Sequence, residues 1–209
     1  EAWAKKIFPE LSKREAMNKL WDAILKCARV NGDPVENWKA HNAYLLEKCT
    51  KLNDLNIDKL TINNINIISG LALGIDSIAH EESLNNLGKT IAVLGNGVNE
   101  CYPFRNNKLQ KEIIKNGLII SEYPPNVKPS RINFPKRNRI IAALCDALLV
   151  IEANKRSGTM ITVNEALNLG KDIMCVPNRV DEDSGCNELI KNGAYLVENA
   201  FDVLEILNE

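Results

Sequence analysis

The segment SRINFPKRNRIIAALCDALLVIE, from Ser130 to Glu152, joins a basic helix start to an apolar strand. Its middle predicts a helix over Pro135–Leu144, and its end predicts a strand over Ala147–Glu152 that is apolar on both faces. Strands of this kind belong to parallel sheets that helices cover on both sides. The segment therefore predicts an α/β fold with three cations at the start of one helix.

The same alternation of apolar runs and helical patterns continues on both sides of this segment. The predicted strands are Ile65–Ser69, Thr90–Gly95, Leu118–Glu122, Ala147–Glu152, Asp172–Pro177 and Ala194–Val197. The predicted helices are Gly74–Leu87, Phe104–Asn116, Pro135–Leu144, Thr159–Leu169, Cys186–Asn192 and Ala200–Leu207. Strand–helix alternation implies right-handed βαβ units, so we expect a doubly wound, mostly parallel sheet over residues 61–209.

The first sixty residues predict helices and no strand. Leu20, Ile24 and Ala28 repeat at helical spacing, which predicts a first helix. A second helix begins with Asp33 as N-cap and Pro34 in its first turn, and its apolar side continues to Leu52. We therefore expect a helical hairpin over residues 1–60 that precedes the sheet domain.

The overall composition is that of an ordinary globular protein. The 209 residues are 45% hydrophobic and 25% charged, with a net charge of -1. No apolar run reaches the roughly 18 residues that a membrane span needs, and no CxxC pair occurs among the cysteines. The cytosol is the expected compartment. The six cysteines are Cys27, Cys49, Cys101, Cys145, Cys175 and Cys186, of which Cys145 and Cys175 lie in apolar contexts and are expected to be buried.

Positive charge is concentrated in one part of this nearly neutral chain. Residues 104–139 hold two carboxylates and nine cations: Arg105, Lys108, Lys111, Lys115, Lys128, Arg131, Lys136, Arg137 and Arg139. A positive face on a neutral protein is typical of contact with a polyanion such as a phosphate backbone. A solvated basic turn is the alternative.

The turns that follow the predicted strands indicate where a ligand would lie. Ligands of open parallel sheets bind outside the carboxyl ends of the strands, and helix starts there favour phosphate. Together with the basic helix start, these turns supply the candidate contacts Ser69, Gly70, Gly74, Gly95, Gly97, Lys136, Arg137, Asn138, Arg139, Ser157, Gly158 and Thr159. We predict that they bind a polyanion.

Two polar residues on one predicted helix invite a second interpretation. Asp76 and His80 are four residues apart and face the same side. They can pair or bind a metal, but no third ligand lies near them in the sequence, so we expect no metal. We expect Asp76 to orient the preceding glycine loop and His80 to pack on the helix face. No nucleophile–base–orienter set is apparent, so no catalytic residue is predicted.

Several motifs in this chain resemble those of one known family. The motifs are SGLALGID with AH (Ser69–His80), TIAVLGNG with YP (Thr90–Pro103), GLIISE (Gly117–Glu122), FPKRNRII (Phe134–Ile141), IEA with SGTMIT (Ile151–Thr162) and GCNELIKNGA (Gly185–Ala194). In order and spacing they resemble the DNA-processing protein family DprA, also called Smf, over about residues 63–209.

The resemblance implies a Rossmann-like fold and a function. Members of this family are usually dimeric, bind single-stranded DNA and load the RecA recombinase in natural transformation; they are not known as enzymes and need no cofactor. It implies that Lys136, Arg137 and Arg139 contact DNA phosphates, with help from Ser69, Gly70 and the helix start at Ser157–Thr159. The family normally begins with a further strand and a glycine–serine–arginine turn, which this sequence does not match; the resemblance begins only near Asn63.

The first sixty residues resemble a different family. The runs EAWAKKIFP (residues 1–9), KLW (residues 19–21), RV with DP (residues 29–34) and KLN (residues 51–53) are similar to an internal piece of the thermophilic metalloaminopeptidases, aminopeptidase T among them. The metal-binding segments of that family are absent, and His41 alone holds no catalytic metal. The two resemblances together indicate a chimera.

Three functions remain open at this point. The first is the single-stranded DNA-binding mediator. The second is a nucleotide-binding or nucleotide-hydrolysing protein of the phosphoribohydrolase type, in which a catalytic glutamate follows a glycine–threonine helix start by three residues. Thr162 occupies that position here and cannot act as an acid or base. The third is a metalloaminopeptidase, and a fusion without function is a further alternative.

Overall fold

The computed structural model describes residues 41–46, 60, 64–179 and 184–208. The chain divides into two compact units, Glu1–Lys39 and Ala40–Glu209, and every described residue belongs to the second. Within the described part, no helix is long and apolar enough to cross a membrane.

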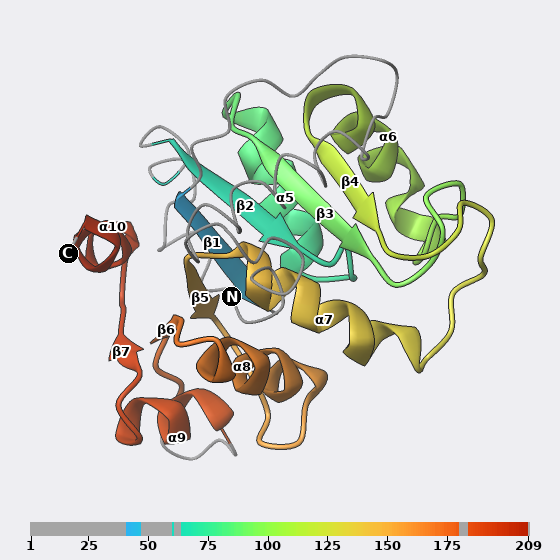
Figure 1. Cartoon of the computed structure of the whole chain (residues 1–209). Helices are drawn as coiled ribbons and strands as arrows, with labels where there is room; N and C mark the ends of the chain where they lie inside the picture. The colour runs from blue at the N-terminus through green and yellow to red at the C-terminus, as the bar shows by residue number, and fades with distance from the viewer. Residues whose placement is uncertain (1–40, 47–59, 61–63, 180–183, 209) are drawn as a thin grey trace, which may run out of the picture. The chain divides into compact units, whose positions relative to one another are not determined.

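A parallel sheet forms the centre of the second unit (Figure 1). Its seven strands lie in the order β4-β3-β2-β1-β5-β6-β7, and every neighbouring pair is parallel. The strands are β1 His41–Leu46, β2 Ile65–Ser69, β3 Thr90–Leu94, β4 Leu118–Ser121, β5 Ala147–Val150, β6 Asp172–Cys175 and β7 Tyr195–Leu196. Because the chain first adds strands on one side of β1 and then on the other, the order reverses between β1 and β5. Ligands of such sheets bind near this reversal.

The helices fall close to their predicted ranges. They are α5 Ile75–Asn85, α6 Asn107–Asn116, α7 Asn133–Leu144, α8 Gly158–Asn168, α9 Gly185–Lys191 and α10 Ala200–Asn208, and a short 3-10 helix, η1 Phe104–Asn106, precedes α6. The predicted helix over Phe104–Asn116 is thus two elements. The predicted doubly wound α/β fold is confirmed, and all six predicted strands are present in register with one another.

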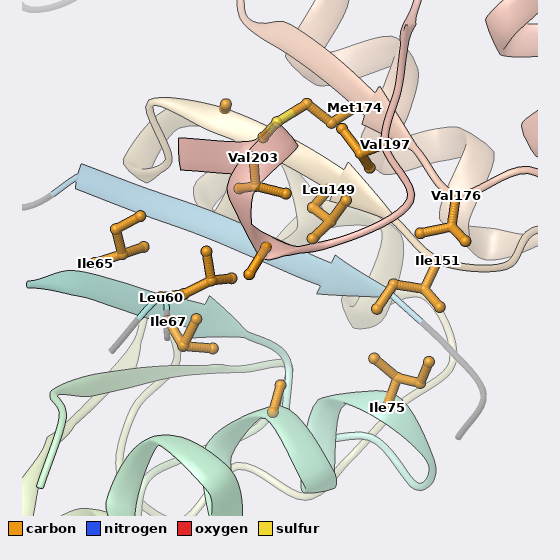
Figure 2. Packing of buried hydrophobic residues seen from close by; sticks show 13 residues of the cluster. Leu60, Ile65, Ile67, Ile75, Leu149, Ile151, Met174, Val176, Val197 and Val203 are labelled. Atoms are coloured by element: carbon orange, nitrogen blue, oxygen red, sulfur yellow. The ribbon is translucent and has the colours of Figure 1, made fainter. Parts of the chain in front are cut away.

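In β2, β3 and β5, alternate residues are buried on opposite faces of the sheet. Ile65 and Ile67 of β2 pack with Leu149 of β5, and Ile75 of α5 and Val203 of α10 cover them (Figure 2). Neighbouring residues such as Leu148, which point the other way, are equally buried. Figure 1 shows α7 and α8 on that opposite side, packed against each other. Burial on both faces explains why the strands are apolar without alternation.

The predicted burial of two cysteines is confirmed. Cys145 and Cys175 are fully buried, and burial raises the pKa of the Cys145 thiol to about 12. Both therefore behave as small apolar side chains rather than as reactive thiols.

One part of the N-terminal prediction is wrong. His41–Leu46 lies within the second predicted helix, yet it forms β1, which pairs with β2 on one side and β5 on the other. Hydrogen bonds to two neighbouring strands override the local helical pattern, which is the usual outcome when tertiary pairing competes with propensity. The sheet therefore has a strand before Ile65, although the sequence does not match the further strand and turn with which the family normally begins. It also begins earlier than the predicted boundary at residues 60 and 61. The remainder of the predicted hairpin lies outside the described residues.

Candidate nucleic-acid interface

The side chain of Arg137 is buried at the carboxyl ends of β2 and β3 rather than exposed on the protein surface. It comes from the N-terminal half of α7 and is only 6% exposed. Its Nη1 donates to the carbonyl oxygen of Gly70 at 2.7 Å and to that of Val93, and its Nε donates to Oδ1 of Asn138 at 3.0 Å. The predicted role as an exposed phosphate contact does not fit this position. The guanidinium instead satisfies strand-end carbonyls and leaves a positive charge beneath the surface.

Phe134 is a site residue that the sequence analysis missed. An added Cβ on Gly95 would lie 2.7 Å from its ring, so Gly95 is the glycine that admits the ring. The ring of Tyr102 lies 5.3 Å away, and the guanidinium carbon of Arg137 lies 5.9 Å from the ring centre. The sequence shows both the glycine turn and the FP dipeptide, but their contact depends on the fold.

The predicted approach of a ligand to three glycines does not fit their surroundings. A Cβ added to Gly70 would lie 2.5 Å from the guanidinium of Arg137, and one added to Gly95 would meet the ring of Phe134. A Cβ added to Gly97 would lie 2.2 Å from the carbonyl oxygens of both Pro124 and Pro125. The protein itself therefore occupies the space beside each of them. Gly74 has another role, because its φ of 94° at the start of α5 is one that other residues rarely adopt.

Asp76 holds the turn after β2, as predicted. Its Oδ2 accepts hydrogen bonds from the backbone N–H groups of Gly70 at 3.0 Å and Ala72 at 3.1 Å. Burial raises the pKa of Asp76, and Arg137 and these amides oppose that shift. Ser69, another predicted contact, is fully buried at the end of β2. Both residues thus lie beneath the surface that a ligand would reach.

His80 is fully buried and bonded to the sheet. Its Nδ1 lies 2.6 Å from the hydroxyl of Thr90, which donates to the carbonyl oxygen of Ile67 at 2.9 Å. Because the Thr90 proton is used, we assign the imidazole proton to Nδ1. Burial lowers the pKa of His80 to about 3, with Arg137 adding to the effect, so the ring is neutral. Asp76 and His80 therefore have separate partners, and no three potential ligands gather among the described residues.

Several cations of residues 104–139 are exposed and have no partner among the described residues. Lys115 pairs with Glu112, Lys128 with Glu100, and Arg139 with Glu122. In the part of the chain that the structure describes, no hydrogen bond or ion pair engages five exposed cations of residues 104–139: Arg105, Lys108, Lys111, Arg131 and Lys136. Of the three predicted basic contacts, Lys136 alone is exposed and unpaired there.

Apolar side chains are exposed beside these cations. Tyr102 is 48% exposed, Phe104 77% and Ile132 69%. The ring contact between Tyr102 and Phe134 places the residues around η1 next to the start of α7. Arg105 and Lys136 thus lie on segments that meet at these rings. Cations interleaved with exposed rings are typical of surfaces that bind unpaired polynucleotide.

The start of α8 is the open part of the predicted site. An added Cβ on Gly158 has no heavy atom within 4 Å, in contrast to Gly70, Gly95 and Gly97. Ser157 occupies the N-cap position without a side-chain cap, and Thr159 is buried in the first turn. The side chain of Asn138 reaches the carbonyl oxygen of Gly158 at 3.5 Å, which connects α8 to the basic helix α7. The N–H groups of a helix start favour an anion, so this end of α8 suits a phosphate.

Comparisons with known proteins identify two unrelated parts. Residues 46–208 match the model of the DNA recombination-mediator protein A family, and residues 1–79 match that of a thermophilic metalloprotease family. Aminopeptidase T of Thermus aquaticus is 47% identical over 53 residues, which is 25% of this chain and 13% of that protein. Both resemblances drawn from the sequence are therefore confirmed.

The relatives of the larger part are DNA-processing proteins. DNA processing protein DprA of Streptococcus pneumoniae is 43% identical over 161 residues, covering 75% of this chain and 57% of the relative. Protein Smf of Synechocystis is 48% identical over 140 residues, covering 66% of this chain and 35% of the relative. The chain thus spans between about a third and three-fifths of the length of these two relatives.

Solved structures agree with these relatives in fold. The S. pneumoniae DprA structure has a TM-score of 0.73 at 40% identity and covers 80% of this chain and 62% of its own. DNA processing protein A of Helicobacter pylori, described for its single-stranded DNA binding mode, has a TM-score of 0.72 at 29% identity and covers 88% and 91%. The molybdenum cofactor carrier protein of Chlamydomonas reinhardtii, at 12% identity and a TM-score of 0.55, shares the fold alone. With its strand order, its basic helix start and this match over most of its length, the chain belongs to the DNA recombination-mediator protein A family.

Proposed function

We propose that this protein binds single-stranded DNA along the carboxyl ends of β2, β3 and β4 and the starts of α7 and α8. The observation that carries the proposal is that exposed rings lie at one edge of the sheet together with cations that have no partner among the described residues. Arg131 and Lys136 flank the start of α7, and Phe104 lies on the neighbouring segment. Cations bind phosphates, and the flat faces of unpaired bases stack on exposed rings.

The preference for a single strand follows from the same surface. Paired bases bury their faces inside a duplex, so exposed rings gain little from duplex DNA. The description of the H. pylori relative supports this choice. The near-neutral net charge of the chain also favours a local contact rather than general attraction to nucleic acid.

The test is a fluorescence-anisotropy titration with oligo-dT and with duplex DNA of equal length, each at several salt concentrations. We expect tighter binding to the single strand and an affinity that falls with salt. Replacing Arg131 and Lys136 together by Ala removes two phosphate contacts, so the log–log salt slope is expected to flatten by about 1.4. Equal affinity for duplex, or a slope that the double variant leaves unchanged, contradicts the proposal.

Lys89→Ala is the matched control for this titration. Lys89 is exposed and directly precedes β3, so it lies at the amino edge of the sheet, away from the proposed surface. It removes one positive charge, half of what the double variant removes, and we expect no change in salt slope. An equal effect of Lys89→Ala would mean that the slope reports overall charge rather than this site.

We further propose that the protein acts as a recombination mediator in natural transformation, passing bound DNA to RecA in the cytoplasm. The family match supports the mediator role. A homodimer is proposed through the last strand and helix, Ala194–Leu207, because Tyr195, Leu196 and Phe201 are exposed there. Sedimentation of the wild type and of Phe201→Glu tests the dimer: a monomeric variant supports this interface, and a dimeric one excludes it.

We also propose that the protein is not an enzyme and needs no cofactor. The helix start that hydrolyses nucleotides in related folds requires a carboxylate where this chain has Thr162, and the Thr162 side chain is fully buried. Release of free base from nucleoside monophosphates, measured with the purified chain, would overturn this part and revive the hydrolase alternative.

A further inference from the structure

Arg139 and Arg137 lie two residues apart in α7 but meet different partners. Arg137 is buried against backbone carbonyls, whereas the side chain of Arg139 is 53% exposed and pairs with the carboxylate of Glu122. Glu122 comes directly after β4 and is itself 39% exposed. Arg139 is therefore the cation of the KRNR segment whose charge an acidic side chain neutralises in the free protein.

The backbone around Glu122 is fixed by its neighbour. The hydroxyl of Ser121 donates to the carbonyl oxygen of Asn96 at 2.6 Å and accepts the backbone N–H of Tyr123 at 3.1 Å. These bonds connect the end of β4 to the turn after β3. Glu122 thus extends from a held segment toward α7, and its meeting with Arg139 does not depend on a loose loop.

The pair is also weak enough to be opened. Exposed ion pairs contribute about 0–1 kcal/mol, because water and salt screen them. A phosphate oxygen forms the same charge-assisted hydrogen bonds with a guanidinium as a carboxylate does. DNA that reaches α7 therefore competes with Glu122 for one side chain, and the two anions repel each other if both stay.

From this geometry we propose that Glu122 is a built-in competitor of the DNA phosphate at Arg139. The inference rests on the proposed function and deepens it. In the free protein Glu122 occupies Arg139; DNA displaces it and places an uncompensated carboxylate beside the bound strand. The consequence is a lower affinity and easier release, which suits a protein that hands its DNA to another.

A double-mutant cycle tests the competition directly. Oligo-dT affinity and salt slope are measured for the wild type, Glu122→Gln, Arg139→Ala and the double variant. We expect Glu122→Gln to bind about fivefold more tightly, the upper limit for an exposed pair, and to steepen the log–log salt slope by about 0.7, one additional phosphate contact. When Arg139 is already Ala, the gain from Glu122→Gln is expected to fall below about twofold, because only distant repulsion remains.

Glu112→Gln is the matched control. Glu112 is the other carboxylate of residues 104–139, is exposed to a similar degree and pairs with Lys115 within α6. It removes the same charge without freeing Arg139, so we expect a change below about twofold. Urea unfolding of each variant checks that all are folded, and Glu122→Ala serves as a second variant at the same position.

Each outcome decides between the inference and its alternatives. An equal gain with and without Arg139, or an equal gain from Glu112→Gln, means that Glu122 acts only through distant repulsion and overturns the competition. A loss of affinity in Glu122→Gln means that the carboxylate positions Arg139 for DNA and also overturns it. DNA binding that Glu122→Gln leaves unchanged rejects this inference alone, whereas a wild type that binds no oligo-dT rejects the proposed function as well.

Discussion

The turns after β2 and β3 and the start of α8 carry similar glycines, but their surroundings differ. Gly70, Gly95 and Gly97 each face a protein group closer than 3 Å to an added Cβ, whereas Gly158 faces nothing within 4 Å. The first three glycines admit Arg137, Phe134 and the carbonyls of Pro124 and Pro125. We call these turns the filled corner and the start of α8 the open corner. A glycine at the end of a strand therefore indicates close packing as readily as access for a ligand.

The filled corner depends most on Arg137. Replacing Arg137 by Ala removes the donor that two buried carbonyl oxygens share, at Gly70 and Val93. Hydrogen bonds from charged groups contribute about 1.5–3 kcal/mol each, so we expect a loss of about 3–6 kcal/mol in the free energy of unfolding. Urea unfolding measures it.

Lys136→Ala is the control for that loss, since Lys136 is exposed on the same turn of α7. We expect its unfolding midpoint to stay near that of the wild type while its DNA affinity falls. A stable Arg137→Ala variant with a normal midpoint would show that the corner is not held by the guanidinium.

The second prediction compares the two corners directly. In Gly97→Ala the new methyl group would meet two backbone oxygens at 2.2 Å, which cannot move as a flexible side chain does. We expect a loss of about 2–3 kcal/mol, the usual cost of overpacking. Gly158→Ala adds the same methyl group in open space within a helix, so we expect a gain of up to about 1 kcal/mol.

The DNA affinity of Gly158→Ala tests whether the open corner contacts DNA. A methyl group at the open corner lies where a phosphate would approach, so we expect Gly158→Ala to weaken oligo-dT binding although the fold is intact. If Gly158→Ala binds as the wild type does, the open corner is not part of the DNA surface.

The third prediction concerns whether water reaches His80, which is buried in the core below the filled corner. The pKa of His80 is about 3 in the folded protein and ordinarily near 6.5. Between these values the unfolded chain binds more protons than the folded one, so stability is full above pH 6.5 and falls below it. At pH 5 the loss is expected to be about 2 kcal/mol.

His80→Gln isolates this effect. Asp76, whose pKa burial raises, acts in the opposite direction as pH falls, so the total pH dependence combines both groups. The histidine contribution is the difference between wild type and His80→Gln, measured by urea unfolding at pH 5 and pH 7. Equal pH dependence in both proteins would mean that water reaches His80.

The secondary structure from Ile65 onward could be predicted because each strand there is apolar on both faces and ends at a glycine or polar turn. β2 begins and ends where its pattern does, at Ile65 and Ser69. β1 could not be predicted in this way, since HNAYLL has no strand pattern of its own and its conformation comes from two neighbouring strands. A segment that both neighbours pair with needs little local preference.

The candidate site was predicted in its position but not in its contacts. Motif order located the strand ends and the basic helix, and Asp76 was correctly assigned to the glycine loop. The separation of Arg137, Arg139 and Lys136 into buried, paired and free cations follows from the direction each side chain takes from α7. Adjacent residues in a helix differ by about 100° in direction, so one basic run reaches three environments.

The sequence by itself determined the parallel α/β architecture, the edge at which the positive charge gathers and the family to which residues 46–208 belong. These depend on periodicity, spacing and residue order, which are properties of the chain. The tertiary structure alone decided which glycines are filled and which is open, and which cation of α7 is buried, which is paired and which is exposed. Those properties depend on what another segment brings to within a few ångströms, and no local pattern carries that distance.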